Sequence, residues 1–442
     1  MGVKRRTTWA CSIATIATAW FATFGADARA EAAPSVAPAP SSSVSVSASV
    51  PADALPLSLE EALKRSDERA PQVLMARYLV REAEARRVGA GVIMPVNPRL
   101  SGDARPPITG GTLKDLGFAA NLEAYFDLGG APSARVREAD RGTDVAHTDV
   151  LLEKTDARAA TWAAYVRAEA ASRRIDSTTA LVRISERILN ASQKRSSLGA
   201  AGDIEQAAAT SELGVLRASV DVAIRRREQY VTELRMLLDL PPDQKLALTT
   251  PLTSPGGVPE SAPLVAKALR ARPEFAKLNA RIALLDATDT RLSRETFPRL
   301  GAYVGVDAAP VSPIFGLLGL SVELPVAQRN AGPRAVVKAT RAGENARIEL
   351  QARQVVREVI ASRSAYESRR SELKTLSEVA IPAAERTLEL VETGWLAGRF
   401  DIFRVTTASR DLARIRELQL DALESVWLER IALDRAVGGG IQ

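Results

Sequence analysis

Cysteine and histidine are almost absent from this chain. Its 442 residues include one cysteine, Cys11, and one histidine, His147. Zinc and redox-metal sites are built largely from these two side chains, so no such site is expected. A Ser-His-Asp arrangement could use only His147, and no G-x-S-x-G motif accompanies it. We therefore interpret His147 as an ordinary surface or core residue.

Phosphate-binding loops and a strong charge bias are absent as well. The sequence has no G-x-x-x-x-G-K-[ST] motif and no G-x-G-x-x-G motif after a strand-like segment. The formal charge of +6 is too weak to indicate nucleic-acid binding, and half of it comes from the first thirty residues. We therefore expect a protein that is not an enzyme, holds no cofactor and binds no nucleic acid.

Long apolar runs are missing except at the N-terminus. Basic residues at positions 4–6 precede the mostly apolar segment Thr8–Gly25, and Ala28-Arg29-Ala30 is a small-residue cleavage motif. This pattern predicts a signal peptide over residues 1–30, cleaved after Ala30. A membrane anchor is the alternative, but serine and threonine interrupt the run. Residues 31–56 are rich in Ala, Pro, Ser and Val, which predicts a flexible arm.

The rest of the chain repeats one plan twice. Helical runs open around Ala62-Leu63 and Ala268-Leu269, and each run ends at a Pro-Arg-Leu step, at residues 98–100 and 298–300. Two strand-like segments and two long helical segments follow in each half. A duplication of this size predicts two copies of one structural unit, over residues 57–255 and 256–442.

Proline is absent between Pro132 and Pro241. This gap predicts a helix over 133–197, about 100 Å long at the usual rise per residue, and a returning helix over 203–239. The second copy predicts helices over 333–393 and 401–437. Pro382 lies inside the former and predicts a local kink, and Asp401 is a candidate N-cap for the latter.

Apolar and polar residues alternate in the strand-like segments, 98–106 and 116–128 in the first copy and 300–308 and 316–326 in the second. Strands of about 9–11 residues can cross a bilayer in a tilted barrel. Glu123 and Glu323 lie in mid-strand, where a lipid-facing carboxylate would be costly, so we expect both to face a water-filled lumen. A soluble sheet with one polar face explains the alternation equally well.

The order of these segments resembles the TolC-like outer-membrane efflux proteins, in particular the branch that works with heavy-metal and drug pumps of the resistance-nodulation-division (RND) type. The resemblance extends from Leu57 to Val437. It rests on the segments ALKRSDERAPQV, ALRARPEFAKLNARI, PRLSG, PRLGAYVGV, LGLSVELPVAQRNAGPRA and ETGWLAGRFDIFRVTTASRDLAR.

The resemblance implies a mainly α fold with a small β part. Three copies would form a homotrimer, each giving four strands to a twelve-stranded barrel in contact with outer-membrane lipid. Their long antiparallel coiled-coil helices would form a tunnel in the periplasm. The partners would be a periplasmic adaptor protein and an inner-membrane RND pump, and the chain would be a passive exit duct for small molecules or metal ions.

The turns between the long helices match the tunnel tips of the family, where the adaptor docks. The glycines at these turns are Gly199, Gly202, Gly394 and Gly398. Simple reversal of the helices explains them at least as well. The gate region of the family corresponds to Asp401, Arg404 and Thr407. Relatives often carry acidic residues there, so a negatively charged gate is in doubt for this chain.

Two alternatives remain open at the level of sequence. The same architecture could serve as the outer-membrane duct of a type I protein secretion system. A periplasmic coiled-coil scaffold would explain the helices but not the matched strand pairs.

Overall fold

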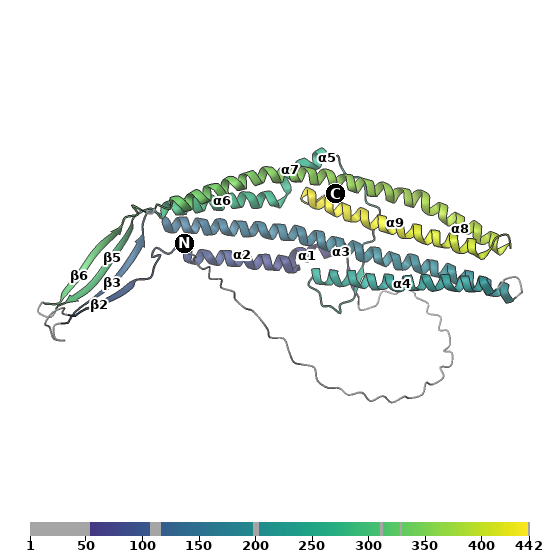
Figure 1. Cartoon of the computed structure of the whole chain (residues 1–442), viewed down its shortest axis with the longest axis horizontal. Helices are drawn as coiled ribbons and strands as arrows, with labels where there is room; N and C mark the ends of the chain where they lie inside the picture. Colours follow the sequence, from purple (N-terminus) through teal and green to yellow (C-terminus); the bar gives the residue numbers. More distant parts are fainter. Residues whose placement is uncertain (1–53, 107–115, 198–202, 310–312, 328, 441–442) are drawn as a thin grey trace, which may run out of the picture. The chain divides into compact units, whose positions relative to one another are not determined.

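Long antiparallel helices and a four-stranded sheet dominate the structure (Figure 1). The computed structural model describes residues 54–106, 116–197, 203–309, 313–327 and 329–440. All of them belong to one compact unit, Val50–Gln442. The predicted fold class, mainly α with a small β part and four strands in one sheet, is confirmed for the single chain.

Apart from the short strands β1 and β4 of the first half, the described helices and strands occur in the same order in the two halves. The elements of the first half are β1 (Leu55–Leu57), α1 (Leu59–Arg69), α2 (Pro71–Ala90), β2 (Arg99–Arg105), β3 (Gly117–Asp127), α3 (Ala131–Ser197), α4 (Asp203–Leu237) and β4 (Leu246–Leu248). The elements of the second half are α5 (Ser261–Ala271), α6 (Pro273–Arg294), β5 (Arg299–Ala308), β6 (Phe315–Glu323), α7 (Ala331–Thr375), a π-helical turn (Leu376–Ala380), α8 (Ile381–Leu396) and α9 (Ile402–Val437).

Each predicted opening helix is in fact two helices, because a proline divides it. Pro71 begins α2, and Ala70 before it has ψ 133, outside the helical region. Pro273 begins α6 in the same way, after Arg272 with ψ 127. A proline ring disfavours helical backbone at the residue before it, while its missing N–H is harmless at the first helical position.

The sheet joins the two halves of the chain. Its strand order is β2-β3-β5-β6, and every neighbouring pair is antiparallel. The central pair, β3 and β5, comes from different halves, with Leu122 opposite Val304. Strands β2 and β6 each pair on one side only, so the sheet of a single chain has two open edges.

Helix α3 is the central strut of the helical part. Its 67 residues contain no proline after Pro132, which removes the usual cause of a helix break. It contacts α2 and α6 near the sheet, and α4 and α9 farther along its length (Figure 1). Among the described residues, none of the helices combines the length and the apolar character needed to span a membrane.

A short parallel pair of strands was not predicted from the sequence. β1 pairs with β4, and its Leu55 and Pro56 lie inside the segment predicted to be a flexible arm. The buried Tyr165 of α3 fastens this pair, because its hydroxyl donates to the carbonyl of Leu57 and accepts from the N–H of Thr250. The chain is therefore ordered two residues earlier than its composition suggests.

Apolar packing in the long helices forms separate clusters. One cluster includes Val166 on α3, Leu373 on α7 and Val426 on α9. Another lies nearer the α8–α9 turn and includes Leu181 on α3 and Leu388 on α8. A kink was predicted at Pro382; the structure has a π-helical turn just before it, which directly precedes α8.

Candidate functional site

The four-stranded sheet has one apolar and one polar face. Cross-strand partners share a face, so the register sorts every strand residue to one side or the other. Large apolar side chains gather on one face and are exposed in the single chain; examples are Leu100 (76%), Leu122 (45%), Val304 (52%), Leu318 (87%) and Leu320 (73%). An exposed apolar surface of this kind marks a face that meets a partner or lipid.

Glu123 and Glu323 both lie on the opposite, polar face. Glu123 is the register partner of Arg99 and Tyr303, and its Oε1 accepts a hydrogen bond of 2.6 Å from the Tyr125 hydroxyl. Glu323 is the partner of Arg299. Both carboxylates therefore lie on the same side of the sheet, opposite the apolar face, as the alternation of residues in the sequence predicted.

Small residues on the polar face make room for tyrosine rings. A methyl group on Gly319 would lie 2.2 Å from Cζ of Tyr303 on the neighbouring strand. A methyl group on Gly301 would lie 3.1 Å from Cε1 of Tyr125 and 2.2 Å from the Ser321 hydroxyl. Each tyrosine ring therefore occupies space that a side chain at the glycine of the neighbouring strand would fill.

A buried carboxylate lies where the sheet meets the helices. The side chain of Asp127, 3% exposed, pairs with Arg135 of α3 at 2.5 Å and with Arg299 of β5 at 3.0 Å. Arg135 also donates to the carbonyls of Ala90 and Val92 after α2. Asp127 of β3 thus links its own strand to β5 and to α3. Through Arg135, it also links these elements to the connection that follows α2. The sequence did not reveal this group of charged residues, although Arg299 belongs to the repeated Pro-Arg-Leu step.

The turn between α8 and α9 has a specific backbone geometry. Gly398 has φ +72, the left-handed conformation that glycine adopts most easily. Its N–H donates to the carbonyl of Trp395, and the N–H of Arg399 donates to the carbonyl of Gly394. This pair of bonds is the Schellman motif, which terminates a helix. Gly398 is therefore explained by the reversal of the chain.

The other predicted residues of this turn lie beside it. A methyl group on Gly394 would lie 2.4 Å from the Phe400 ring, so the glycine admits the ring. The carboxylate of Asp401 accepts from the N–H of Arg404 at 3.0 Å, which confirms the predicted N-cap of α9. Arg404 lies over the Phe400 ring, 5.1 Å from its centroid. Arg404 and Thr407 are both exposed.

Three predicted residues lie outside the described part of the chain: Gly199 and Gly202, between α3 and α4, and Ala30 at the predicted cleavage point. His147 is exposed on α3.

Trp395 connects the two helical hairpins, a role that the sequence did not reveal. Arg195 of α3 donates to the Trp395 carbonyl at 2.8 Å, and its guanidinium lies 5.3 Å from the centroid of the buried indole ring. A guanidinium over an aromatic face is attracted to it. In the sequence, the only indication of this contact was a tryptophan placed between the two glycines of the turn.

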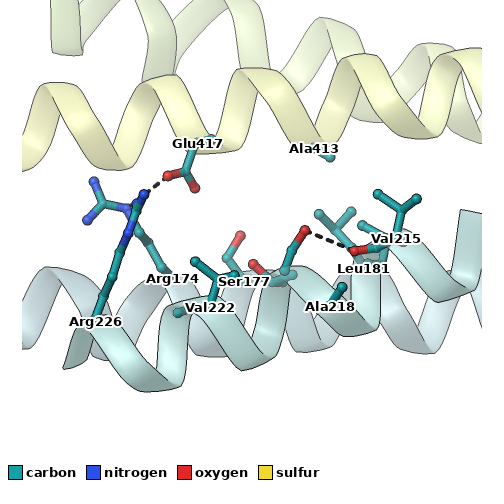
Figure 2. Close-up of a pocket in the computed structure, with 13 residues that line it drawn as sticks. Arg174, Ser177, Leu181, Val215, Ala218, Val222, Arg226, Ala413 and Glu417 are labelled. Carbon is teal, nitrogen blue, oxygen red and sulfur yellow. Dashed lines mark hydrogen bonds and ion pairs between the residues drawn. The ribbon is translucent and has the colours of Figure 1, made fainter. Parts of the chain in front are cut away.

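A second interhelical contact involves Arg174 of α3. Its guanidinium, 8% exposed, binds three carboxylates on successive turns of α9: Glu417 and Glu424, each at 3.0 Å, and Asp421. Figure 2 shows the Arg174–Glu417 pair at one end of a groove between the helices. Burial lowers the pKa of Arg174, but the three carboxylates outweigh it, so the pKa lies above its usual value.

The contacts described above serve packing, ion pairing and the reversal of the chain between α8 and α9. Within those residues, no group of three or more His, Cys, Asp or Glu side chains is placed to hold a metal ion. The distinctive features are a two-faced sheet, a tight helical turn and arginine contacts between the hairpins.

Comparison with known proteins identifies the class of this architecture. No protein-family model matches the chain. The chain is 25% identical over 337 residues to the cobalt-zinc-cadmium resistance protein CzcC of Cupriavidus metallidurans, covering 72% of this chain and 76% of the relative. The outer-membrane channel OprN aligns with a TM-score of 0.71 at 19% identity, over 86% of this chain and 90% of OprN. CusC aligns with a TM-score of 0.69 at 16% identity, over 86% and 92%.

The fold is therefore that of an outer-membrane channel. The predicted resemblance to the TolC-like outer-membrane efflux proteins is confirmed, and solved proteins that share this fold, such as OprN and CmeC, are outer-membrane channels.

Proposed function

We propose that this chain is the outer-membrane duct of a tripartite efflux system. The observation that carries this proposal is the open, two-faced sheet attached to long helices. Unpaired strand edges and an exposed apolar face are unfavourable in one chain, and closure of three sheets into one twelve-stranded barrel would remove both. The apolar face would contact lipid, and residues 57–255 and 256–442 would each supply two strands.

The polar face would line a water-filled lumen. Glu123 and Glu323 lie opposite the apolar face, and a carboxylate on the lipid side of a barrel would be costly. Passage would be passive, because an inner-membrane RND pump would supply the energy and this chain would supply only the path.

The turns of the long helices would form the far end of the tunnel. Gly394 and Gly398 shape the α8–α9 turn, and Gly199 and Gly202 would shape its counterpart between α3 and α4. A periplasmic adaptor would dock at these turns, and Asp401, Arg404 and Thr407 would lie at the gate. Opening would follow when docking favours an open conformation over the closed one.

Divalent heavy-metal cations are the cargo that we propose to test first. The support is the relative CzcC, a cobalt-zinc-cadmium resistance protein. Deletion of the gene in its host should lower the tolerated concentrations of Co²⁺, Zn²⁺ and Cd²⁺, and restoring the gene should recover them. Unchanged tolerance to these ions, with impaired export of a protein substrate, would instead favour a type I secretion duct.

Membrane fractionation tests the proposed location. The chain should stay with outer membranes after high-salt or alkaline washing and leave them only in detergent, and its mass should correspond to cleavage after Ala30. Release by salt would contradict the proposal and favour a periplasmic scaffold.

Engineered cross-links test the proposed gate. Cysteines introduced near Asp401 should join neighbouring subunits of a trimer, and oxidation should block efflux until a reductant is added. Normal efflux through fully cross-linked trimers would contradict this assignment.

A further inference from the structure

The two hairpins of the four-stranded sheet are equivalent residue by residue. Arg99 lies opposite Glu123 in the β2–β3 hairpin, and Arg299 lies opposite Glu323 in the β5–β6 hairpin. Equivalent residues of the two copies therefore share their last two digits. The junction between the hairpins, where β3 pairs with β5, lies inside one chain and places Glu123 opposite Tyr303. This junction shows how one copy of the repeat meets the next.

The edge strand β6 stops earlier than its counterpart β3. β3 continues to Asp127, because β5 pairs with it as far as that residue. β6 ends at Glu323, where its pairing with β5 also ends. Residues 324–327 correspond to the end of β3, and no strand of the described chain pairs with them. The open edge of β6 therefore lacks a partner equivalent to β5.

Strand β2 of a second copy of this chain fits that edge. β2 is the other open edge of the sheet, and within the repeat it is equivalent to β5. Three chains with two hairpins each close into a barrel of uniform stagger only if the junction between chains repeats the junction within a chain. The register that places Glu123 opposite Tyr303 then places Glu323 opposite Asp103 of the partner subunit.

This register preserves the two faces of the sheet. Asp103 lies opposite Ala119, which is on the same face of β3 as Glu123. On the apolar face, the same register places Val322 opposite Ala104 of the partner subunit. A slip by one residue would instead put charged side chains of one strand beside apolar side chains of the other.

The two kinds of junction differ in charge. Within the chain, the carboxylate of Glu123 faces the neutral Tyr303. Between chains, Glu323 faces a second carboxylate, Asp103 of the partner subunit. In the single chain Asp103 is exposed and the Glu323 side chain is 59% exposed. Like charges directly opposite each other destabilise a sheet, but a water-filled lumen lowers this cost because dissolved cations screen the pair.

The neighbouring arginines do not cancel this charge. Arg105, farther along β2, binds Asp307 of its own sheet at 3.2 Å. Arg299 binds the buried Asp127 at 3.0 Å and reaches Glu323 only at 3.7 Å. Each junction between chains therefore keeps an excess of negative charge on the polar face.

We propose that Glu323 faces Asp103 of the partner subunit at each junction between subunits, and that these carboxylate pairs make the lumen of the barrel selective for cations. The inference rests on the proposed function, since only a closed barrel has these junctions. Rings of acidic side chains give channels a preference for cations. Near the α8–α9 turn the exposed residues include Arg404 and Thr407, and Asp401 caps α9. The selectivity therefore arises in the barrel.

Paired cysteines test the register. In a Cys11→Ser background, Asp103→Cys with Glu323→Cys should form disulfides between subunits on mild oxidation, because directly opposite Cβ atoms lie about 4.5–5.5 Å apart. The control, Arg105→Cys with Glu323→Cys, tests the register that opposite charges alone would favour. Its cysteines should stay largely reduced, since diagonal neighbours lie about 7–8 Å apart. Non-reducing denaturing gels should show linked subunits for the first variant. Stronger linkage in the control, or none in either variant, would overturn the register.

Reversal potentials test the effect of the charge. Currents of the purified protein are recorded in planar lipid bilayers under a gradient of KCl. Asp103→Asn with Glu323→Gln should shift the reversal potential toward zero, because fewer cations are attracted into the lumen. The matched control, Asp103→Glu with Glu323→Asp, keeps both charges and should keep the wild-type potential. A wild-type potential in the neutral variant would overturn the assignment.

A charged label separates the effect of charge from that of structure. In Asp103→Cys, a negatively charged methanethiosulfonate reagent should restore the preference for cations, and a positively charged one should shift the potential in the opposite direction. Equal potentials after the two reagents would count against Asp103. Absence of pore current from the wild-type protein would contradict the proposed function itself, whereas pore current without these shifts would contradict this inference alone.

Discussion

Asp127 and Arg299 are register partners on β3 and β5 and form an ion pair of 3.0 Å across the two halves of the chain. The same carboxylate binds Arg135 of α3 at 2.5 Å. One buried side chain therefore links the central strand pair of the sheet to the central helix.

Neutralising the Asp127 carboxylate should destabilise the folded protein. Asp127→Asn leaves two arginines without their carboxylate at a site that is 3% exposed. Breaking one partner of a buried ion pair costs about 3–5 kcal/mol, so the free energy of unfolding measured in denaturant should fall by about this amount. In the control, Asp307→Asn, the ion pair with the 60% exposed Arg105 is lost, at a cost of at most about 1 kcal/mol. Equal losses in the two variants would contradict the role of Asp127.

Gly319 should tolerate no side chain while Tyr303 remains in place. A Cβ there would lie 2.2 Å from the tyrosine ring, and overpacking of this kind costs about 1–3 kcal/mol. Gly319→Ala should therefore lower the unfolding midpoint in denaturant, and adding Tyr303→Ala should recover part of the loss. Gly316 lies on the same strand with open space around it, so Gly316→Ala is the matched control and should have little effect.

Gly398 should be replaceable by asparagine more easily than by alanine. Its φ of +72 is a left-handed conformation, which costs an ordinary residue about 1–2 kcal/mol, whereas asparagine tolerates it better. Thermal unfolding should rank the variants as glycine, asparagine, alanine in falling order. Gly343→Ala, in the interior of α7 with open space around it, should instead stabilise the protein. A loss of stability there would show that helix propensity is not the governing factor.

Glu169 should make stability depend on pH. Burial in α3 raises the pKa of its carboxyl above the ordinary value of 4.5, and Asp176 raises it further, while Arg173 and Arg227 oppose the shift. Because the folded protein favours the protonated form, this contribution to stability is complete below about pH 4.5 and is lost as pH rises through the raised pKa.

Glu169→Gln should therefore raise the melting temperature at pH 7 relative to wild type, and the difference should shrink toward pH 4. The control is Glu82→Gln, which removes an exposed partner of Arg86 at the same i,i+4 spacing. Its melting temperature should follow wild type at both pH values. A larger benefit at pH 4 than at pH 7 would contradict the assignment to Glu169.

Local signals accounted for much of the architecture. The absence of proline predicted the long helices, and alternation predicted all four strands of the sheet within a few residues. The N-cap at Asp401 and the glycine turn before it were predicted because each acts over three to five residues. The division of the opening helices at Pro71 and Pro273 was missed, although the prolines were visible, because the apolar pattern continues across them.

By itself, the sequence determined which segments are helix or strand, where the α8–α9 turn falls and which side of the sheet carries Glu123 and Glu323. Only the tertiary structure decided that β3 pairs with β5, that Asp127 joins the sheet to α3 and that Arg174 meets Glu417 across 243 residues. The physical reason is the distance along the chain over which each kind of interaction acts. Backbone preferences and side-chain periodicity act within a turn or two, whereas the partner of a buried charge is selected by packing between segments that no local pattern connects.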